Sequence, residues 1–111
     1  MLHRLQKLDE YQDLCHDIHQ NSAIPSEVLD EFSILIGKNT GKIDLTLIAL
    51  IHGNEVGNIQ LLINLLKDII SGNQAISINL ALTLGNVQAF KEGKRFARKR
   101  RKKILITALA I

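Results

Sequence analysis

The apolar pattern between positions 43 and 84 restricts the fold of this chain more than any other feature. Residues 43–51 are rich in isoleucine and leucine and predict a buried β-strand. From residue 57 to residue 70 the apolar period becomes helical, and residues 76–84 predict a second strand. Two strands joined through a helix are usually parallel, because parallel neighbours need a long crossover connection. The sequence therefore predicts an α/β fold built on a parallel βαβ unit.

The first 42 residues predict a helical lead-in to this unit. Apolar residues recur every three or four positions up to about Asn21, which is typical of one face of an amphipathic helix. Pro25 restarts the chain, and we expect Val28 and Leu29 to lie on a short helical turn. Residues 32–36 fit either a continued helix or a strand. Two glycines and an asparagine in residues 37–42 predict a turn.

Length and composition indicate one globular unit. The 111 residues are 46% hydrophobic and 23% charged, which excludes a disordered chain. No apolar run reaches the roughly 18 residues of a membrane span, and the N-terminus has no signal-peptide pattern. The single cysteine, Cys15, excludes an internal disulfide. We therefore expect a cytoplasmic location and no membrane partner.

The net charge of +3 comes from one local run. Residues 97–103 hold six of the fourteen basic side chains, and the chain without them would carry a charge of −3. A basic run raises the possibility of a nucleic-acid-binding protein. This run has no aromatic interleaving and no charge elsewhere to extend the patch, so the sequence makes a nucleic-acid partner the weaker hypothesis.

Polar residues follow both predicted strands at the point where each strand ends. His52 and Glu55 follow the first strand, and Asn86 and then Arg95 follow the second. Ligands of open α/β sheets bind beyond the carboxyl ends of the strands, so these groups are expected to converge. His52 and Glu55 are three positions apart and could hold one zinc ion. The alternative for this common spacing is a turn histidine beside a glutamate that interacts with the helix dipole.

The residues around His52 favour the metal-binding interpretation. Residues 47–57 read LIALIHGNEVG, and residues 84–89 and 93–96 read LGNVQA and GKRF. In order and separation, these blocks resemble the succinylglutamate desuccinylase/aspartoacylase family, relatives of the zinc carboxypeptidases. The resemblance covers about residues 45–96. It implies a partial zinc-carboxypeptidase-like (phosphorylase/hydrolase-like) fold and hydrolysis of the amide bond of N-acyl amino acids.

The resemblance also implies a role for each matching residue. His52 and Glu55 match two of the three Zn²⁺ ligands, and Arg95 matches the arginine that polarises the scissile carbonyl and stabilises the oxyanion. Asn86 matches a structural residue that shapes the loop before Arg95. The third ligand, a histidine, and the catalytic glutamate lie further along the family's chains. His3, His16 and His19 precede the motif, and His16 and His19 could bind metal only adventitiously.

The sequence departs from the family pattern after Phe96. Val87 replaces a family proline, and Lys102 and Lys103 stand where an Asn-Arg pair would clamp the substrate carboxylate. The sequence thus divides into a lead-in segment (1–42), a partial zinc hydrolase domain (43–96) and a basic, non-native tail (97–111). We expect this tail to pack poorly. The expectation is a frameshifted or shortened member of the family, inactive as an isolated chain.

Two alternatives from other functional classes remain open at this point. One is a nucleic-acid binder that uses the basic tail. The other is a non-catalytic α/β module that associates with another copy through an open sheet edge, since exposed edges pair readily. A small-molecule N-acyl amino acid is the partner that the resemblance implies.

Overall fold

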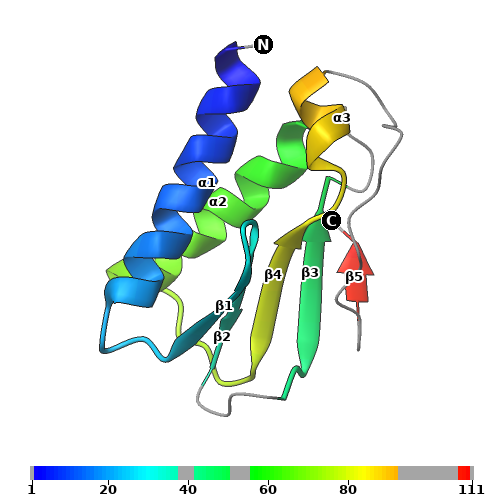
Figure 1. Ribbon diagram of the computed structural model, residues 1–111. Coiled ribbons are helices and arrows are strands. Elements are labelled where there is room, and N and C mark those ends of the chain that lie inside the picture. Colours follow the sequence, from blue (N-terminus) through cyan, green and yellow to red (C-terminus); the bar gives the residue numbers. More distant parts are fainter. Residues whose placement is uncertain (1, 38–41, 51–55, 93–107, 111) are drawn as a thin grey trace.

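The computed structural model describes residues 2–37, 42–50, 56–92 and 108–110. It contains three helices and five strands within these ranges (Figure 1). In chain order they are α1 (Leu2–Gln20), β1 (Ser26–Asp30), β2 (Ser33–Ile36), β3 (Leu45–Ala49), α2 (Val56–Ser71), β4 (Leu80–Leu84), α3 (Val87–Glu92) and β5 (Ala108–Ala110). The amphipathic helix expected up to about Asn21 is confirmed as α1.

The five strands form one mixed sheet in the order β1-β2-β4-β3-β5. β3 and β4 are parallel neighbours, with Leu45 opposite Leu80 and Ala49 opposite Leu84. Helix α2 connects them along the chain, so the pairing is the one that the strand–helix–strand pattern predicts. β1, β2 and β4 pair in antiparallel fashion. The carboxyl ends of β3 and β4 therefore lie next to each other at one edge of the sheet.

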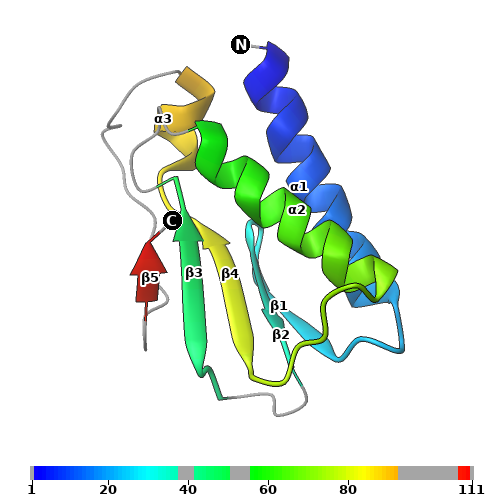
Figure 2. The same ribbon diagram turned by 180° about the vertical axis from the view of Figure 1, so that it is seen from behind.

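Helices α1 and α2 run side by side and share one hydrophobic core with the sheet (Figures 1 and 2). In α2 the buried positions are Ile59, Leu62, Ile63, Leu66 and Ile69, which recur at helical spacing. They form one buried cluster with side chains of paired strands, such as Ile34 of β2 and Leu82 of β4. This core holds α2 against β3 and β4.

The prediction of a helical turn around Val28 and Leu29 is wrong. Residues 26–36 instead form the antiparallel hairpin β1–β2. Its turn is stabilised by Asp30, whose Oδ1 accepts the backbone N–H of Phe32 at 2.9 Å. Pairing of β2 with β4 buries all four residues of β2, so tertiary packing decides the ambiguous segment in favour of a strand.

The strands at the centre of the sheet are shorter than predicted. β4 begins at Leu80, because the partner strands β2 and β3 pair no further than Ile36 and Leu45. The preceding residue, Asn79, donates its backbone N–H to Asp44 Oδ2 and accepts the Asp44 N–H through its carbonyl oxygen, both at 2.8 Å. Ile78, within the predicted strand 76–84, precedes β4 and is 42% exposed. Ile51, the predicted end of the first strand, lies outside the described residues.

The C-terminal tail was predicted to pack poorly, but residues 108–110 belong to the sheet. Ala108–Ala110 form β5 and pair in parallel with β3, with Leu109 opposite Leu47. β3 is therefore flanked on both sides by parallel strands. The basic run at residues 98–103 lies outside the described residues.

Candidate functional site

The two strand ends that the sequence singled out are joined by backbone hydrogen bonds. Gly85 donates its N–H to the carbonyl oxygen of Ala49 at 2.8 Å, and Asn86 donates to that of Leu50 at 2.6 Å. The beginnings of α2 and α3 lie at the same end of the molecule (Figure 1). The chain thus leaves β3 and enters α3 from neighbouring points, as the predicted convergence requires.

Asn86 is the residue that begins α3. Its Oδ1 accepts the N–H of Ala89 at 3.3 Å, and its carbonyl oxygen accepts the N–H of Phe90 at 3.1 Å. This is an N-cap arrangement, in which the asparagine side chain satisfies a backbone donor that has no partner within the helix. Asn86 is 5% exposed, so its amide serves the protein rather than solvent. The structural role expected for Asn86 is consistent with this geometry.

Leu50 has a backbone conformation that leucine rarely adopts. Its φ is 61°, in the left-handed region, and its side chain is fully buried. A left-handed conformation costs a non-glycine residue about 1–2 kcal/mol. Burial of a leucine side chain contributes about 1.5–3 kcal/mol, which is enough to offset that cost. Sequence reasoning missed Leu50, because a leucine among apolar residues carries no signal of a left-handed turn.

Arg4 connects the start of α1 to α3. Its guanidinium carbon lies 5.8 Å from the centroid of the Phe90 ring, a distance that allows a cation–π contact. Phe90 is fully buried, so the contact lies against the core. Sequence reasoning missed this contact as well, because no local pattern pairs residues so far apart in the chain.

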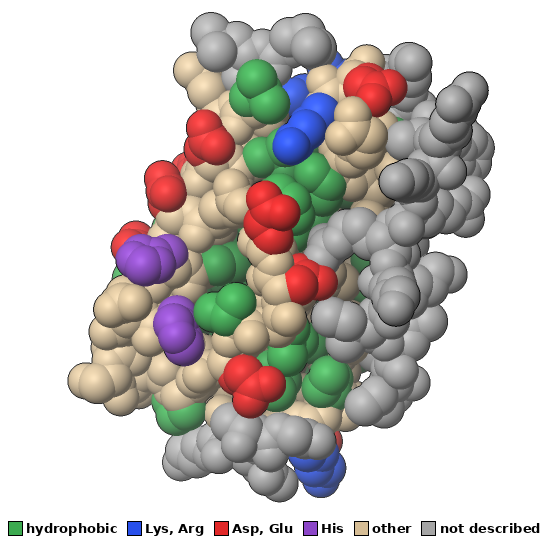
Figure 3. Space-filling model, in the orientation of Figure 1, with side chains coloured by type: hydrophobic (Ala, Val, Ile, Leu, Met, Phe, Trp, Pro, Cys, Tyr) green, Lys and Arg blue, Asp and Glu red, His purple; other side chains and the backbone are tan. Residues whose placement is uncertain are grey.

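The three predicted site residues His52, Glu55 and Arg95 all lie outside the described residues. The histidines His16 and His19 of α1 are exposed, and Figure 3 shows histidine side chains on the molecular surface. His19 Nδ1 lies 3.5 Å from Ser26 Oγ. Within the described ranges, no three His, Cys, Asp or Glu side chains are placed to hold a metal ion. His3 has no described side chain.

Cys15 is not a candidate nucleophile. Burial raises the pKa of its thiol to about 11, while a hydrogen bond with Tyr11 acts in the opposite direction. A thiol with so high a pKa is almost entirely protonated near neutral pH, and the thiolate is the reactive form. The candidate site therefore remains at the ends of β3 and β4.

Comparison with known proteins assigns the region around these strand ends to a family. Residues 42–102 match the sequence model of the succinylglutamate desuccinylase/aspartoacylase catalytic domain. The chain belongs to this family. The match continues to residue 102, beyond Phe96, where the resemblance recognised in the sequence ends. The first six residues of the tail predicted to be non-native fall within the matched region.

Curated relatives of the family support the same assignment over a shorter stretch. A succinylglutamate desuccinylase of Serratia proteamaculans is 44% identical over 46 residues, and one of Yersinia pestis is 41% identical over 46 residues. In both cases the alignment covers 41% of this chain and 14% of the relative. Both relatives are named desuccinylases, and the family evidence favours neither a nucleic-acid binder nor a non-catalytic module.

Solved structures share the fold. A succinylglutamate desuccinylase from Chromobacterium violaceum has a TM-score of 0.58 at 21% identity, over 78% of this chain and 30% of the other. A succinylglutamate desuccinylase from Vibrio parahaemolyticus has a TM-score of 0.55 at 17% identity. The alignment covers 85% of this chain and 39% of the other. At these identities the likeness concerns the fold. It extends well beyond the matched family region, so the described arrangement of helices and sheet is that of desuccinylase structures.

None of the described helices is both long enough and apolar enough to cross a membrane. The expected cytoplasmic location stays a prediction.

Proposed function

We propose that this chain carries part of the active site of a zinc-dependent hydrolase that cleaves the amide bond of N-acyl amino acids. The observation that carries the proposal is the family match over residues 42–102, which includes both predicted motifs. The hydrogen-bonded ends of β3 and β4 support it, since they bring the starts of both motif segments together. The proposed architecture is a partial zinc-carboxypeptidase-like fold.

His52 and Glu55 are the proposed metal ligands. An imidazole and a carboxylate are ligands that zinc accepts, and catalytic zinc sites keep an open position for water or substrate. His52 follows Leu50 by two residues, and the Leu50 carbonyl is tied to Asn86 at the end of β4. A bound zinc ion would supply a Lewis acid that polarises the substrate carbonyl and acidifies a water molecule.

Arg95 is the proposed group that stabilises negative charge on the carbonyl oxygen. It follows the end of α3, at Glu92, by three residues, and Asn86 fixes where α3 begins. A fixed guanidinium near that oxygen is worth more in the transition state than in the ground state, which is how electrostatic catalysis lowers a barrier. Succinyl and acetyl amino acids are the substrates that the family suggests, and these residues do not discriminate between them.

The 111-residue chain is proposed to bind zinc weakly and to hydrolyse no N-acyl amino acid. No histidine follows His52 in its sequence, so the family's third ligand has no counterpart in it. Catalytic zinc sites have three protein ligands. The proton-transferring glutamate that the resemblance implies also lacks a counterpart, and acid–base catalysis typically contributes about 10²- to 10⁴-fold in rate.

A calorimetric zinc titration with an amidase assay tests this proposal. The wild-type chain should bind zinc with a dissociation constant above about 1 μM, as expected for an incomplete ligand set. His52→Ala should abolish this binding, whereas His16→Ala, on the exposed surface of α1, should leave it unchanged. Equal zinc affinity in wild type and His52→Ala would exclude the metal site. Turnover of N-succinyl or N-acetyl amino acids that is lost in His52→Ala would show a complete enzyme and contradict the predicted inactivity.

A further inference from the structure

We infer that Leu50 is a positioning residue, which fixes the direction in which the chain leaves β3 toward the metal ligands. The inference rests on the proposed function, since it takes His52 and Glu55 to be those ligands. It adds a role for a residue of the 47–57 block to which the family resemblance assigns none. Three observations on Leu50 support it: its backbone conformation, its hydrogen bonds and its burial.

The backbone conformation of Leu50 marks a sharp change of direction at the end of β3. Among the described residues, Leu50 is the one non-glycine residue with a positive φ. A left-handed residue interrupts an extended strand, so the chain turns at this point. Such strained conformations persist where the surrounding structure determines them, and they cluster at functional sites. The turn lies two residues before His52.

Two hydrogen bonds hold this turn on the neighbouring strand. The carbonyl oxygens of Ala49 and Leu50 accept the N–H groups of Gly85 and Asn86, at 2.8 Å and 2.6 Å. Asn86 also caps α3 through its side chain. A change in the Leu50 turn would therefore be transmitted to the start of α3, the helix that precedes Arg95. One backbone contact couples the two segments that carry the proposed site residues.

The side chain of Leu50 anchors the turn in the core. It is fully buried and belongs to the same hydrophobic cluster as Leu84, Val87 and Phe90 around the start of α3. A glycine at this position would adopt the left-handed conformation without strain but would have no side chain to bury. Leucine adopts the turn at a cost in strain and supplies an anchor that glycine lacks. Ligands of a metal site need this kind of support, because small displacements lower the affinity for the metal.

A matched pair of substitutions separates the turn from the volume of the side chain. Leu50→Met keeps an apolar side chain of similar volume without a branch at Cβ, so it should tolerate the left-handed backbone as leucine does. Leu50→Ile keeps the volume but adds a branch at Cβ, which disfavours a positive φ. The same pair at Leu62, fully buried at the centre of α2, is the control. All four variants conserve core volume, which cores tolerate well.

The readout is zinc affinity, measured by calorimetry on the folded proteins, together with the melting temperature. Leu50→Ile should raise the dissociation constant for zinc about tenfold, the size typical of residues that support metal ligands. Leu50→Met should bind zinc as the wild type does. Leu62→Met and Leu62→Ile should alter the melting temperature without altering zinc affinity. If Leu50→Ile does not fold, Leu50→Ala replaces it, since that variant keeps the strain and loses the anchor.

The outcomes distinguish this inference from the proposed function. Zinc affinity that is lost in His52→Ala but unchanged in Leu50→Ile and Leu50→Ala would overturn the role of Leu50 and leave the proposed metal site standing. A loss of affinity in Leu62→Ile equal to that in Leu50→Ile would reduce Leu50 to an ordinary core residue. Affinity unchanged in His52→Ala would overturn the proposed function, and the positioning role of Leu50 with it.

Discussion

Thr46 is the second residue of β3 and carries a buried polar atom. Its side chain is fully buried, and Oγ1 has no hydrogen-bond partner among the residues that the structure describes. A buried polar group left unsatisfied costs about 1–3 kcal/mol. Thr46→Val removes the hydroxyl and keeps the shape and strand preference of the side chain. We expect it to raise the free energy of unfolding by about 1 kcal/mol, measured by urea denaturation.

The same substitution at Thr83 is the control, and its effect should have the opposite sign. Thr83 Oγ1 and Ser33 Oγ are hydrogen bonded at 2.5 Å between the paired strands β4 and β2. Thr83→Val removes this bond and should lower the free energy of unfolding by about 1 kcal/mol. If both variants were destabilised equally, the Thr46 hydroxyl would have a partner, and its unsatisfied state would be disproved.

At the level of single residues, the sequence carries information on candidate motif positions that it does not carry on backbone conformation. The His52 and Glu55 motif and the structural role of Asn86 could be proposed because their residue types and spacing carry chemical information. The left-handed turn at Leu50 could not, because the carbonyl oxygens of Ala49 and Leu50 accept hydrogen bonds from Gly85 and Asn86, which are distant in the sequence. Those donors lie more than thirty positions further along the sequence, and only the parallel pairing of β3 and β4 brings them to Leu50.

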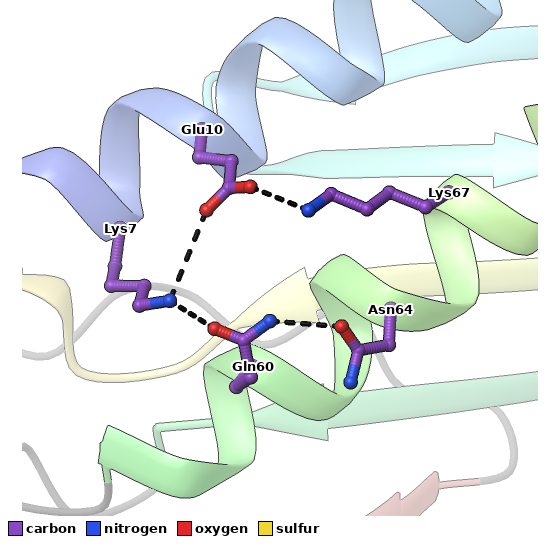
Figure 4. A network of polar contacts seen from close by, with 5 residues as sticks. All are labelled: Lys7, Glu10, Gln60, Asn64 and Lys67. Carbon is purple, nitrogen blue, oxygen red and sulfur yellow. Dashed lines mark hydrogen bonds and ion pairs between the residues drawn. The ribbon is translucent and has the colours of Figure 1, made fainter.

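At the level of elements, α1 and α2 are joined by a polar network at their exposed seam (Figure 4). Glu10 of α1 forms ion pairs with Lys67 of α2 at 2.8 Å and with Lys7 at 3.9 Å. Lys7 also contacts Gln60, which donates to Asn64 at 2.8 Å. The hydrogen bond from Lys67 lowers the pKa of the Glu10 carboxyl below its ordinary value of 4.5.

This lowered pKa gives the network a defined pH dependence. The contribution of Glu10 to stability is complete above pH 4.5 and is lost as the pH falls through the lower pKa of the folded state. Glu10→Gln should reduce the free energy of unfolding at pH 7 by about 0.2–1 kcal/mol, since the pair is largely exposed. The difference in the free energy of unfolding between Glu10→Gln and the wild type should shrink at low pH. Urea denaturation at several pH values between 7 and 2 measures both effects.

Asp13→Asn is the matched control on the exposed surface of α1. It should have little effect on stability at either end of the pH range. A deficit in Glu10→Gln that stays constant on acidification would show that the Glu10 carboxylate does not stabilise the α1–α2 seam.

The elements whose type the sequence misjudged are those fixed by distant partners. Apolar spacing identified α1, α2 and β4, and a continuous run of isoleucine and leucine identified β3. Residues 26–36 are short and lack a clear period; they form strands because β1 pairs with β2 and β2 pairs with the distant β4. The start of β4 was placed too early for a related reason. Ile76 and Ile78 are as apolar as strand residues, but among the described residues the pairing of β4 with β2 and β3 begins only at Leu80.

At the level of the whole molecule, the chain shares a fold and a matched region with the family but spans a small part of its relatives. The matched alignment covers 14% of the length of the curated desuccinylases. The family and its mixed α/β architecture could be predicted from the motifs. The position of β5 could not, because the three residues Ala108–Ala110 carry too little pattern to be assigned a partner. The basic run before them also gave no indication that the family match continues through it to residue 102.

The central claim is that His52 and Glu55 form an incomplete metal site at the ends of β3 and β4. A zinc titration followed by NMR through the imidazole resonances of the four histidines tests it most directly. The account predicts that the His52 resonances shift or broaden at the lowest zinc concentrations, while those of His3, His16 and His19 respond only at higher concentrations. If His16 and His19 respond together before His52, the metal binds on the surface of α1 and the claim is contradicted.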